Sequence, residues 1–284
     1  MRATRRVAHR IGLKATTPTI TFAELAPVSA AIQRQLTEHV APAWKVQATI
    51  QAFPHDVPIP KGYFQVLVCK DIALDHFGYH EDKTGTPFAH VKVSPHWTLT
   101  LSHECVEMVC NPRLERFFRG PSPDSSQGMV DVMAEVCDPC QGARYAYQID
   151  TVWVSDFCLP AYFKSASSPH GPFSHQEHVT APFQVLPGGV LTWKKPGSGA
   201  FFQWVDRGGG WHAEAVDLGA LGAESRTSIY RYPGDVEAAR SPDETTADAW
   251  QKTSQQAYEE ARALEDLLLE KLRVLMADPS AARA

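Results

Sequence analysis

The sequence predicts an α+β fold in which helices and β-strands alternate through the first half, more strands follow, and a long helix ends the chain. Two observations support this fold class. Apolar residues recur at helical spacing near the start and near the end, and segments rich in β-branched and aromatic residues stand between them. With 284 residues, 44% of them hydrophobic, the chain can bury the core of one large domain or of one domain with an appendage.

The N-terminal half begins with a helix and two strands. Residues 23–42 have apolar side chains at helical spacing, and this helix is expected to stop near Pro42. Strands are predicted at residues 44–53 and 63–69, joined by a proline-rich turn. The apolar positions that predict the helix are Leu25, Val28, Ile32, Leu36 and Val40.

Further strands are expected in the middle of the chain. A polar loop through residues 76–85 precedes a strand at residues 87–93, which runs directly into a second helix. Turns rich in proline and glycine separate three later strands, which are predicted at residues 183–186, 190–194 and 200–205. These three strands add to those predicted in the N-terminal half.

The last helix is expected over residues 241–278. A capping box at residues 241–244, with proline at the first helical position, predicts its start. Its apolar residues form a narrow seam: Trp250, Ala257, Ala261, Leu264, Leu268 and Leu275. This seam indicates packing on the body of the protein, self-association or docking of a partner. We therefore divide the chain into a basic, disordered leader (1–20), a domain (21–205), a flexible linker (206–240) and this helix.

Charge is unevenly distributed along the chain. The formal net charge is −5 at pH 7, yet five basic residues precede the first acidic residue, Glu24. Such a leader is expected to be disordered, or to contact nucleic acid, an anionic surface or a targeting machinery. The acidic remainder argues against nucleic acid as the main ligand. No membrane-spanning apolar run, signal peptide or disulfide-type cysteine spacing occurs, so we expect a cytoplasmic protein without a membrane segment.

The most informative motif is the sequence His-Glu-Cys-Val-Glu at residues 103–107, a variant of the zinc-hydrolase helix. Residues four apart lie on one face of a helix, so His103 and Glu107 can both reach one cation. Glu104 lies about 100° round the helix, where a general base can take a proton from a metal-bound water. Because the surrounding run is apolar, burying these groups without a partner would be costly. The motif therefore predicts a Zn²⁺ site rather than a solvated helix face.

Other segments accompany the motif and together carry a resemblance. They lie at residues 78–80, 87–91, 102–112, 135–139 and 155–163. As a set they resemble a group of poorly characterised bacterial and phage proteins that look like zincin metallopeptidases with an H-E-x-x-E helix. The resemblance covers about residues 25 to 195. It implies a zincin-like mixed sheet with an active-site helix, a bound zinc ion and a peptide or protein substrate.

The resemblance also implies a third zinc ligand from a second element, as in gluzincin-type enzymes. Glu135 is expected to be this ligand, with Asp138 orienting the zinc-bound histidine or taking the ligand position itself. At position 111 the resemblance leads us to expect aspartate, but the chain has asparagine. Asn111 is expected to orient a zinc ligand or to be an alternative ligand itself. The residues expected to contact substrate or stabilise an oxyanion are His80, His175 and Tyr147.

Cys137 and Cys140 form a C-x-x-C pair with three interpretations. They can belong to a structural zinc site, form a redox pair, or be ordinary core cysteines beside a proline turn. A structural site would also need Cys105 and Cys110. These two are five residues apart on a helix, so their side chains point to different sides of it. The core interpretation is favoured.

Two classes of function follow from these observations. The first is a zinc-dependent hydrolase, most specifically a metallopeptidase, in which Glu104 activates water. The second is a zincin-like structural or interaction protein that docks partners through residues 241–278. A glutamate in place of the second histidine lowers the charge of the centre and makes its water less acidic, which supports the second class. A calcium or manganese site is disfavoured because the motif offers a histidine and too few oxygens.

Overall fold

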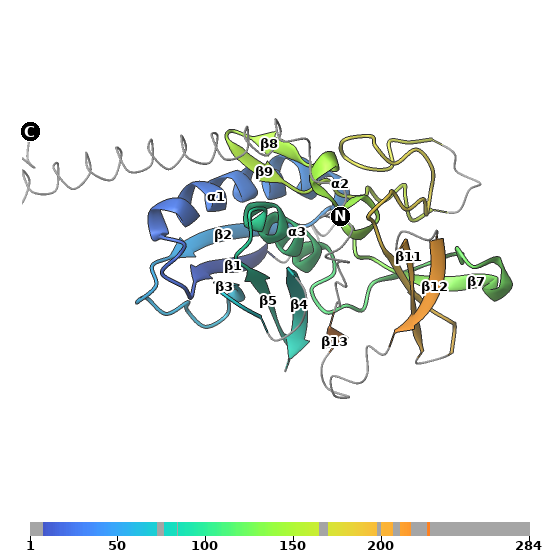
Figure 1. The fold of residues 1–284 in the computed structure, drawn as a ribbon, viewed down its shortest axis with the longest axis horizontal. Coiled ribbons are helices and arrows are strands. Elements are labelled where there is room, and N and C mark those ends of the chain that lie inside the picture. Colours follow the sequence, from blue (N-terminus) through green and yellow to red (C-terminus); the bar gives the residue numbers. More distant parts are fainter. Residues whose placement is uncertain are drawn as a thin grey trace, which may run out of the picture.

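A computed structural model shows a mixed α/β architecture that combines a mixed main sheet, a second antiparallel sheet, a short hairpin and two longer helices (Figure 1). The structure describes residues 8–72, 77–83, 85–164, 170–197, 200–206, 211–216 and 226–227. The expected mixture of helices and additional strands is present, whereas the helix predicted over residues 241–278 lies outside the described residues. No helix in the described part of the chain is both long enough and apolar enough to cross a membrane.

The main sheet has the strand order β13-β4-β5-β3-β1-β2. Its strands are β1 (Ala8–Ala15), β2 (Gln47–Phe53), β3 (Phe64–Cys69), β4 (Gly78–Lys83), β5 (Thr86–Lys92) and β13 (Arg226–Thr227). Strands β1, β2, β3 and β5 are parallel, whereas β4 runs antiparallel to β5 and β13 runs antiparallel to β4. Among the described residues, the antiparallel β4 therefore lies near the edge of the sheet, with only the two-residue β13 outside it.

Two helices pack on one face of this sheet, α1 on β1 and β2, and α3 on β4 and β5 (Figure 1). Helix α1 (Phe22–Arg34) begins with a capping box and continues through a π-helical turn, Gln35–Val40, into α2 (Ala41–Trp44). Helix α3 spans Trp97–Cys110. The first helical segment was expected to stop near Pro42, but it passes this residue because Pro42 occupies the first turn of α2, where a missing N–H costs little.

Residues 8–15 correct the expectation of a disordered leader, because they form β1 between β2 and β3. The strands joined by the proline-rich turn therefore do not pair with each other. Ile11 and Leu13 are fully buried, whereas the guanidinium of Arg10 lies 4.9 Å from the centre of the Tyr63 ring. The basic residues of this strand hid its alternating pattern from the sequence analysis.

Three other segments differ from the sequence prediction. Residues 78–83 form β4 instead of a loop, and residues 211–216 of the expected linker form β12. The strand expected at residues 183–186 is absent: Phe183 has a φ of 57°, a left-handed conformation that a strand does not accept. The ring of Phe183 lies over Gly120 instead, where a Cβ atom would be 2.4 Å from it.

The second sheet is antiparallel throughout, with the order β12-β11-β10-β7-β6. Its strands are β6 (Phe117–Pro121), β7 (Met129–Met133), β10 (Leu191–Lys194), β11 (Phe201–Asp206) and β12 (Trp211–Val216). The hairpin of β8 (Tyr147–Ile149) and β9 (Val152–Val154) packs on α1 and α3. Short 3₁₀ helices are η2 (Ser125–Gln127), η3 (Asp138–Cys140) and η4 (Ala143–Tyr145). One hydrophobic cluster runs from Leu25 of α1 through Leu101 of α3 to Trp193 of the second sheet.

Candidate metal centre

The H-E-x-x-E motif lies on α3, in the interior of the protein (Figure 1). Every residue from Leu101 to Cys110 is buried, so α3 carries its polar side chains inward as well as its apolar ones. The helix predicted at this motif is confirmed. Histidine and carboxylate side chains in such a position need partners, because burying a charge without one is costly.

His103 faces two carboxylates through one ring nitrogen. Its Nε2 is 3.2 Å from Glu107 Oε2 and 3.5 Å from Asp138 Oδ1. The other oxygen of Glu107 accepts hydrogen bonds from the backbone N–H groups of Cys137 and Asp138, at 2.9 and 3.3 Å. These bonds tie the segment after β7 to α3, and they leave Glu107 Oε2 directed at His103.

His80 of β4 reaches the same group of carboxylates from the main sheet. Its Nδ1 is 3.4 Å from Glu104 Oε2 and 3.9 Å from Glu107 Oε2, and its Nε2 is 3.8 Å from Glu135 Oε2. Asn111 Nδ2 donates a hydrogen bond to the other oxygen of Glu135 at 3.0 Å. Asn111 therefore holds Glu135 in place beside His80.

These side chains make up the central cluster: His80, His103, Glu104, Glu107, Glu135 and Asp138. None of them is more than 5% exposed. Five of their buried atoms have no hydrogen-bond partner within the described residues: both ring nitrogens of His80, Oε2 of Glu104, Oε2 of Glu107 and Oδ1 of Asp138. An unpaired buried polar atom costs about 1–3 kcal/mol, and a cation among these atoms would offset that cost.

The arrangement of ligand atoms also fits a metal ion. In the part of the chain that the structure describes, two groups of side chains have potential ligand atoms within 4.8 Å of one another. One group is His103, Glu107 and Cys137, and the other is His80, Glu104 and Glu107. Nitrogen, carboxylate and sulfur donors are typical of transition-metal sites. The central cluster can therefore hold a metal ion.

Burial controls the protonation of the central cluster. It raises the pKa of Glu107 well above its usual value, as neighbouring carboxylates also do, and it raises the pKa of Glu104 and Asp138. Burial lowers the pKa of His103 well below its usual value, and nearby His80 lowers it further. For His80 the carboxylates outweigh burial, so its pKa is raised. Burial therefore favours the protonated form of Glu104, Glu107 and Asp138, whereas metal binding would favour the ionised form.

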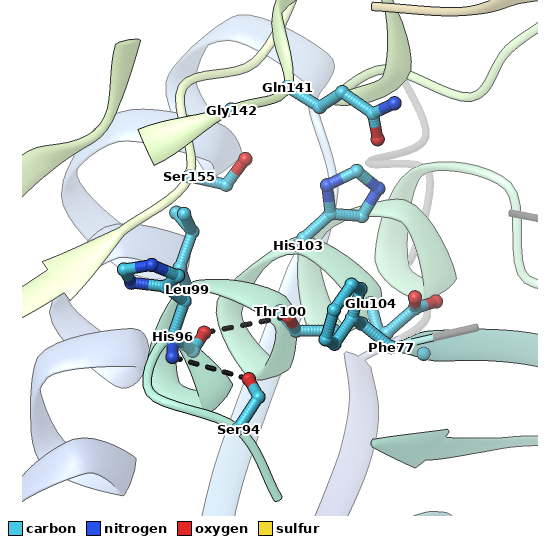
Figure 2. Close-up of a pocket in the computed structure, with 11 residues that line it drawn as sticks. Phe77, Ser94, His96, Leu99, Thr100, His103, Glu104, Gln141, Gly142 and Ser155 are labelled. Atoms are coloured by element: carbon cyan, nitrogen blue, oxygen red, sulfur yellow. Dashed lines mark hydrogen bonds between the residues drawn. The ribbon is translucent and has the colours of Figure 1, made fainter. Parts of the chain in front are cut away.

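A pocket of about 460 Å³, part of it open solvent, reaches the central cluster at His103 and Glu104. Phe77 and Gly78, at the start of β4, line one side of it, and Gln141 lines it as well. Figure 2 shows the His103 ring between the Gln141 side chain and Glu104, with Phe77 beside Glu104. A molecule in this pocket can therefore meet one imidazole and one carboxylate of the motif.

Gln141 is a site residue that the sequence analysis missed. Its side-chain Nε2 donates a hydrogen bond to the Gly188 carbonyl at 2.9 Å, which leaves Oε1 buried without a partner among the described residues. Gln141 follows η3, and the path of this segment depends on contacts with residues far along the chain. No local pattern in the sequence marks it.

Tyr147 and His175 lie together, but they do not line the pocket. The Tyr147 hydroxyl accepts a hydrogen bond from Gln35 Nε2 at 3.2 Å, and the His175 ring stacks on His39 with 4.3 Å between ring centres. Gln35 also accepts a hydrogen bond from Ser102 of α3 at 2.8 Å. The predicted role of Tyr147 and His175 in substrate contact stays a prediction, and the lining of the pocket does not favour it.

Gly78 allows β4 to approach α3 closely at the pocket. A Cβ atom at this position would lie 2.6 Å from Thr100 Cγ2 and 2.7 Å from Glu104 Oε1, too close for either pair. We expect Gly78→Ala to displace Glu104 and to destabilise the protein by about 1–3 kcal/mol, as overpacking usually does. Chemical denaturation measures this change. An unfolding midpoint equal to that of the parent would contradict the expected clash.

No family model matches this chain, and no curated protein or solved structure matches it. What this protein does must therefore be inferred from the residues of the central cluster and the pocket that reaches them. Neither the metal nor a reaction is assigned by likeness to another protein.

Proposed function

We propose that this protein is a zinc-dependent hydrolase, and most specifically a metallopeptidase with a zincin-like fold. The observation that carries the proposal is that the pocket ends on His103 and Glu104, neighbours on α3, with Glu107 one helical turn further on. A metal ligand and a separate carboxylate thus reach the same space. Bound there, a zinc ion would polarise a substrate carbonyl and lower the pKa of a water molecule.

Three side chains would hold the ion: His103, Glu107 and Asp138. His103 Nε2 is 3.2 and 3.5 Å from the oxygens of the two carboxylates. In a tetrahedral zinc site with bonds of about 2.0–2.1 Å, two ligand atoms lie about 3.3 Å apart, so these separations fit such a site. Asp138 is favoured over Glu135 because Glu135 lies beside His80. Cys137 is the competing third ligand, since its thiol belongs to the same group of potential donors.

Glu104 acts as the proton acceptor in this proposal. Its carboxylate lines the pocket, next to the site of the ion but not among the three proposed ligands. Burial raises its pKa, which makes the carboxylate a stronger base for taking a proton from water and returning it to a leaving amine. This is the role that the sequence motif predicts for it.

Two features of the pocket favour an extended peptide as the substrate. Phe77 and Gly78 line the pocket where β4 begins, whereas β13 pairs with β4 only further on, at residues 81 and 82, among the described residues. A peptide chain can extend a sheet along a strand near its edge. Gln141 Oε1, which has no hydrogen-bond partner among the described residues, adds an acceptor for a backbone N–H of the substrate.

Metal content and hydrolysis test the proposal together. Protein purified without added metal should contain zinc and cleave members of a peptide library. A chelator should remove both properties, and added zinc should restore both. A zinc-loaded protein that cleaves nothing would contradict the hydrolase, and a protein that binds no zinc would contradict the metal site as well.

The third ligand is identified by comparing conservative substitutions. Asp138→Asn is expected to lower zinc affinity as strongly as His103→Ala, because both remove a direct ligand. Glu135→Gln should lower it less, by about 10–100-fold, which is usual for a group that orients a ligand. Competition with a coloured chelator measures all three. Parent affinity in Asp138→Asn would contradict this assignment, and a loss in Cys137→Ala would then favour the thiol.

The burial of the central cluster supports a second candidate function. Glu107 and His80 are fully buried, which suits a metal site that stabilises the fold as well as one that acts on a substrate. The protein would then be a metal-holding scaffold that binds partners. Glu104 distinguishes the two functions, since a scaffold does not depend on a proton acceptor beside the ion.

A further inference from the structure

We propose that the central cluster binds two divalent metal ions, which share Glu107 as a bridging ligand. The second ion would be held by His80, Glu104 and Glu107, beside the ion that the proposed function places at His103. The inference deepens that function and rests on it for the first ion only. It accounts for side chains that a single ion leaves without a role.

The two groups of potential ligands meet at Glu107. Its Oε2 is 3.2 Å from His103 Nε2 and 3.9 Å from His80 Nδ1, so it stands between the two imidazoles. On the second side, Glu104 Oε2 is 3.4 Å from the same His80 nitrogen. A carboxylate that faces two imidazoles is placed to bridge two ions, which lie about 3.5–4 Å apart in two-metal sites.

The side of the cluster toward His80 contains most of the unpaired atoms. His80 is fully buried and neither of its ring nitrogens has a hydrogen-bond partner within the described residues, and the same holds for Glu104 Oε2. A second ion would bind His80 Nδ1 and this oxygen. The His80 Nε2–H group would then point at Glu135, as metal-bound histidines commonly orient toward a carboxylate.

The charges of the central cluster also favour two ions. Its four carboxylates carry four negative charges when ionised, and the two imidazoles of the cluster form ion pairs with them. One divalent ion with neutral histidine ligands would leave two negative charges buried. Two divalent ions neutralise all four, which removes the cost of an uncompensated buried charge.

Glu104 can serve the second ion and still face the pocket. Its Oε2 faces His80, whereas its Oε1 lies toward Gly78, which lines the pocket. Ligation through Oε2 alone therefore leaves Oε1 available to accept a proton. An imidazole donor suits zinc, and the carboxylates that gather around both positions supply more oxygens than the motif alone, so that manganese can also bind.

Metal stoichiometry tests the inference directly. The full-length protein, stripped of metal and titrated with Zn²⁺, should bind two equivalents per chain, and His80→Asn should bind one. His55→Asn is the matched control, because His55 is exposed and should leave two equivalents. Saturation of the parent at one equivalent would overturn the inference, and so would two equivalents in His80→Asn.

A spectroscopic measurement on the parent does not depend on how the variants fold. The stripped protein loaded with two equivalents of Mn²⁺ should give the electron paramagnetic resonance spectrum of a spin-coupled pair, because the ions lie about 3.5–4 Å apart. Signals of isolated ions alone would overturn the inference. One bound ion with Glu104-dependent hydrolysis would overturn it and leave the proposed function intact. Two bound ions without hydrolysis would support it and contradict that function.

Discussion

Glu107→Gln is expected to abolish metal binding at the central cluster. Glu107 Oε2 lies near both His103 and His80, while Oε1 accepts two backbone N–H groups from the segment after β7. Glutamine keeps an oxygen for these backbone bonds but removes the charge that faces the imidazoles. Zinc affinity should fall by more than about 100-fold, because losing a group that only orients a ligand already costs about 10–100-fold. Isothermal titration measures this loss.

The matched control for this variant is Glu115→Gln, which makes the same chemical change at an exposed position. It should bind zinc as the parent does. Far-ultraviolet circular dichroism of the metal-free proteins shows whether Glu107→Gln still folds, since the retained backbone bonds should preserve the structure. Parent affinity in a folded Glu107→Gln would exclude Glu107 as a ligand at either position.

The helix of the motif could be predicted from the sequence because its information is local. The apolar run and the spacing of His103, Glu104 and Glu107 specify a helix and place the three side chains near one another without reference to the rest of the fold. Helix α1 was predicted for the same reason, apart from its end beyond Pro42. Local periodicity was enough for both elements.

The remainder of the site depends on strands whose pattern is not local. His80 enters the cluster because β4 pairs with β5 beside α3, and the polar sequence of β4 indicated a loop instead. The position of β1 between β2 and β3 was hidden in the same way, by the basic residues that alternate with Ile11 and Leu13. Pairing partners far apart in the sequence decide both strands, and a single sequence does not specify them.

The choice between Glu135 and Asp138 shows the limit of spacing arguments. Both residues belong to the central cluster, but they approach different histidines: Glu135 lies near His80 and Asp138 near His103. Two residues separate them, and the bonds from the backbone at residues 137 and 138 to Glu107 fix which carboxylate faces His103. That register depends on tertiary contacts with α3.

Glu104→Gln is expected to remove hydrolysis while leaving the ion at His103 in place. Glutamine matches the size of glutamate but cannot accept a proton, and a general base is commonly worth about 10²–10⁴-fold in rate. We therefore expect kcat to fall by about that factor on any peptide that the parent cleaves. Substrate affinity should change little, because Gly78, Gln141 and the rest of the pocket lining are untouched.

The control for this experiment is Glu38→Gln, an exposed glutamate of the π-helical turn, which should keep full activity. Metal analysis of Glu104→Gln should still find the ion at His103, so that a loss of activity is not assigned to an empty position there. If Glu104→Gln retains metal and full hydrolysis, Glu104 is not the base. If the zinc-loaded parent cleaves no peptide at all, the burial of the cluster favours the scaffold, in which the ion stabilises the packing of α3 against β4 and the segment after β7.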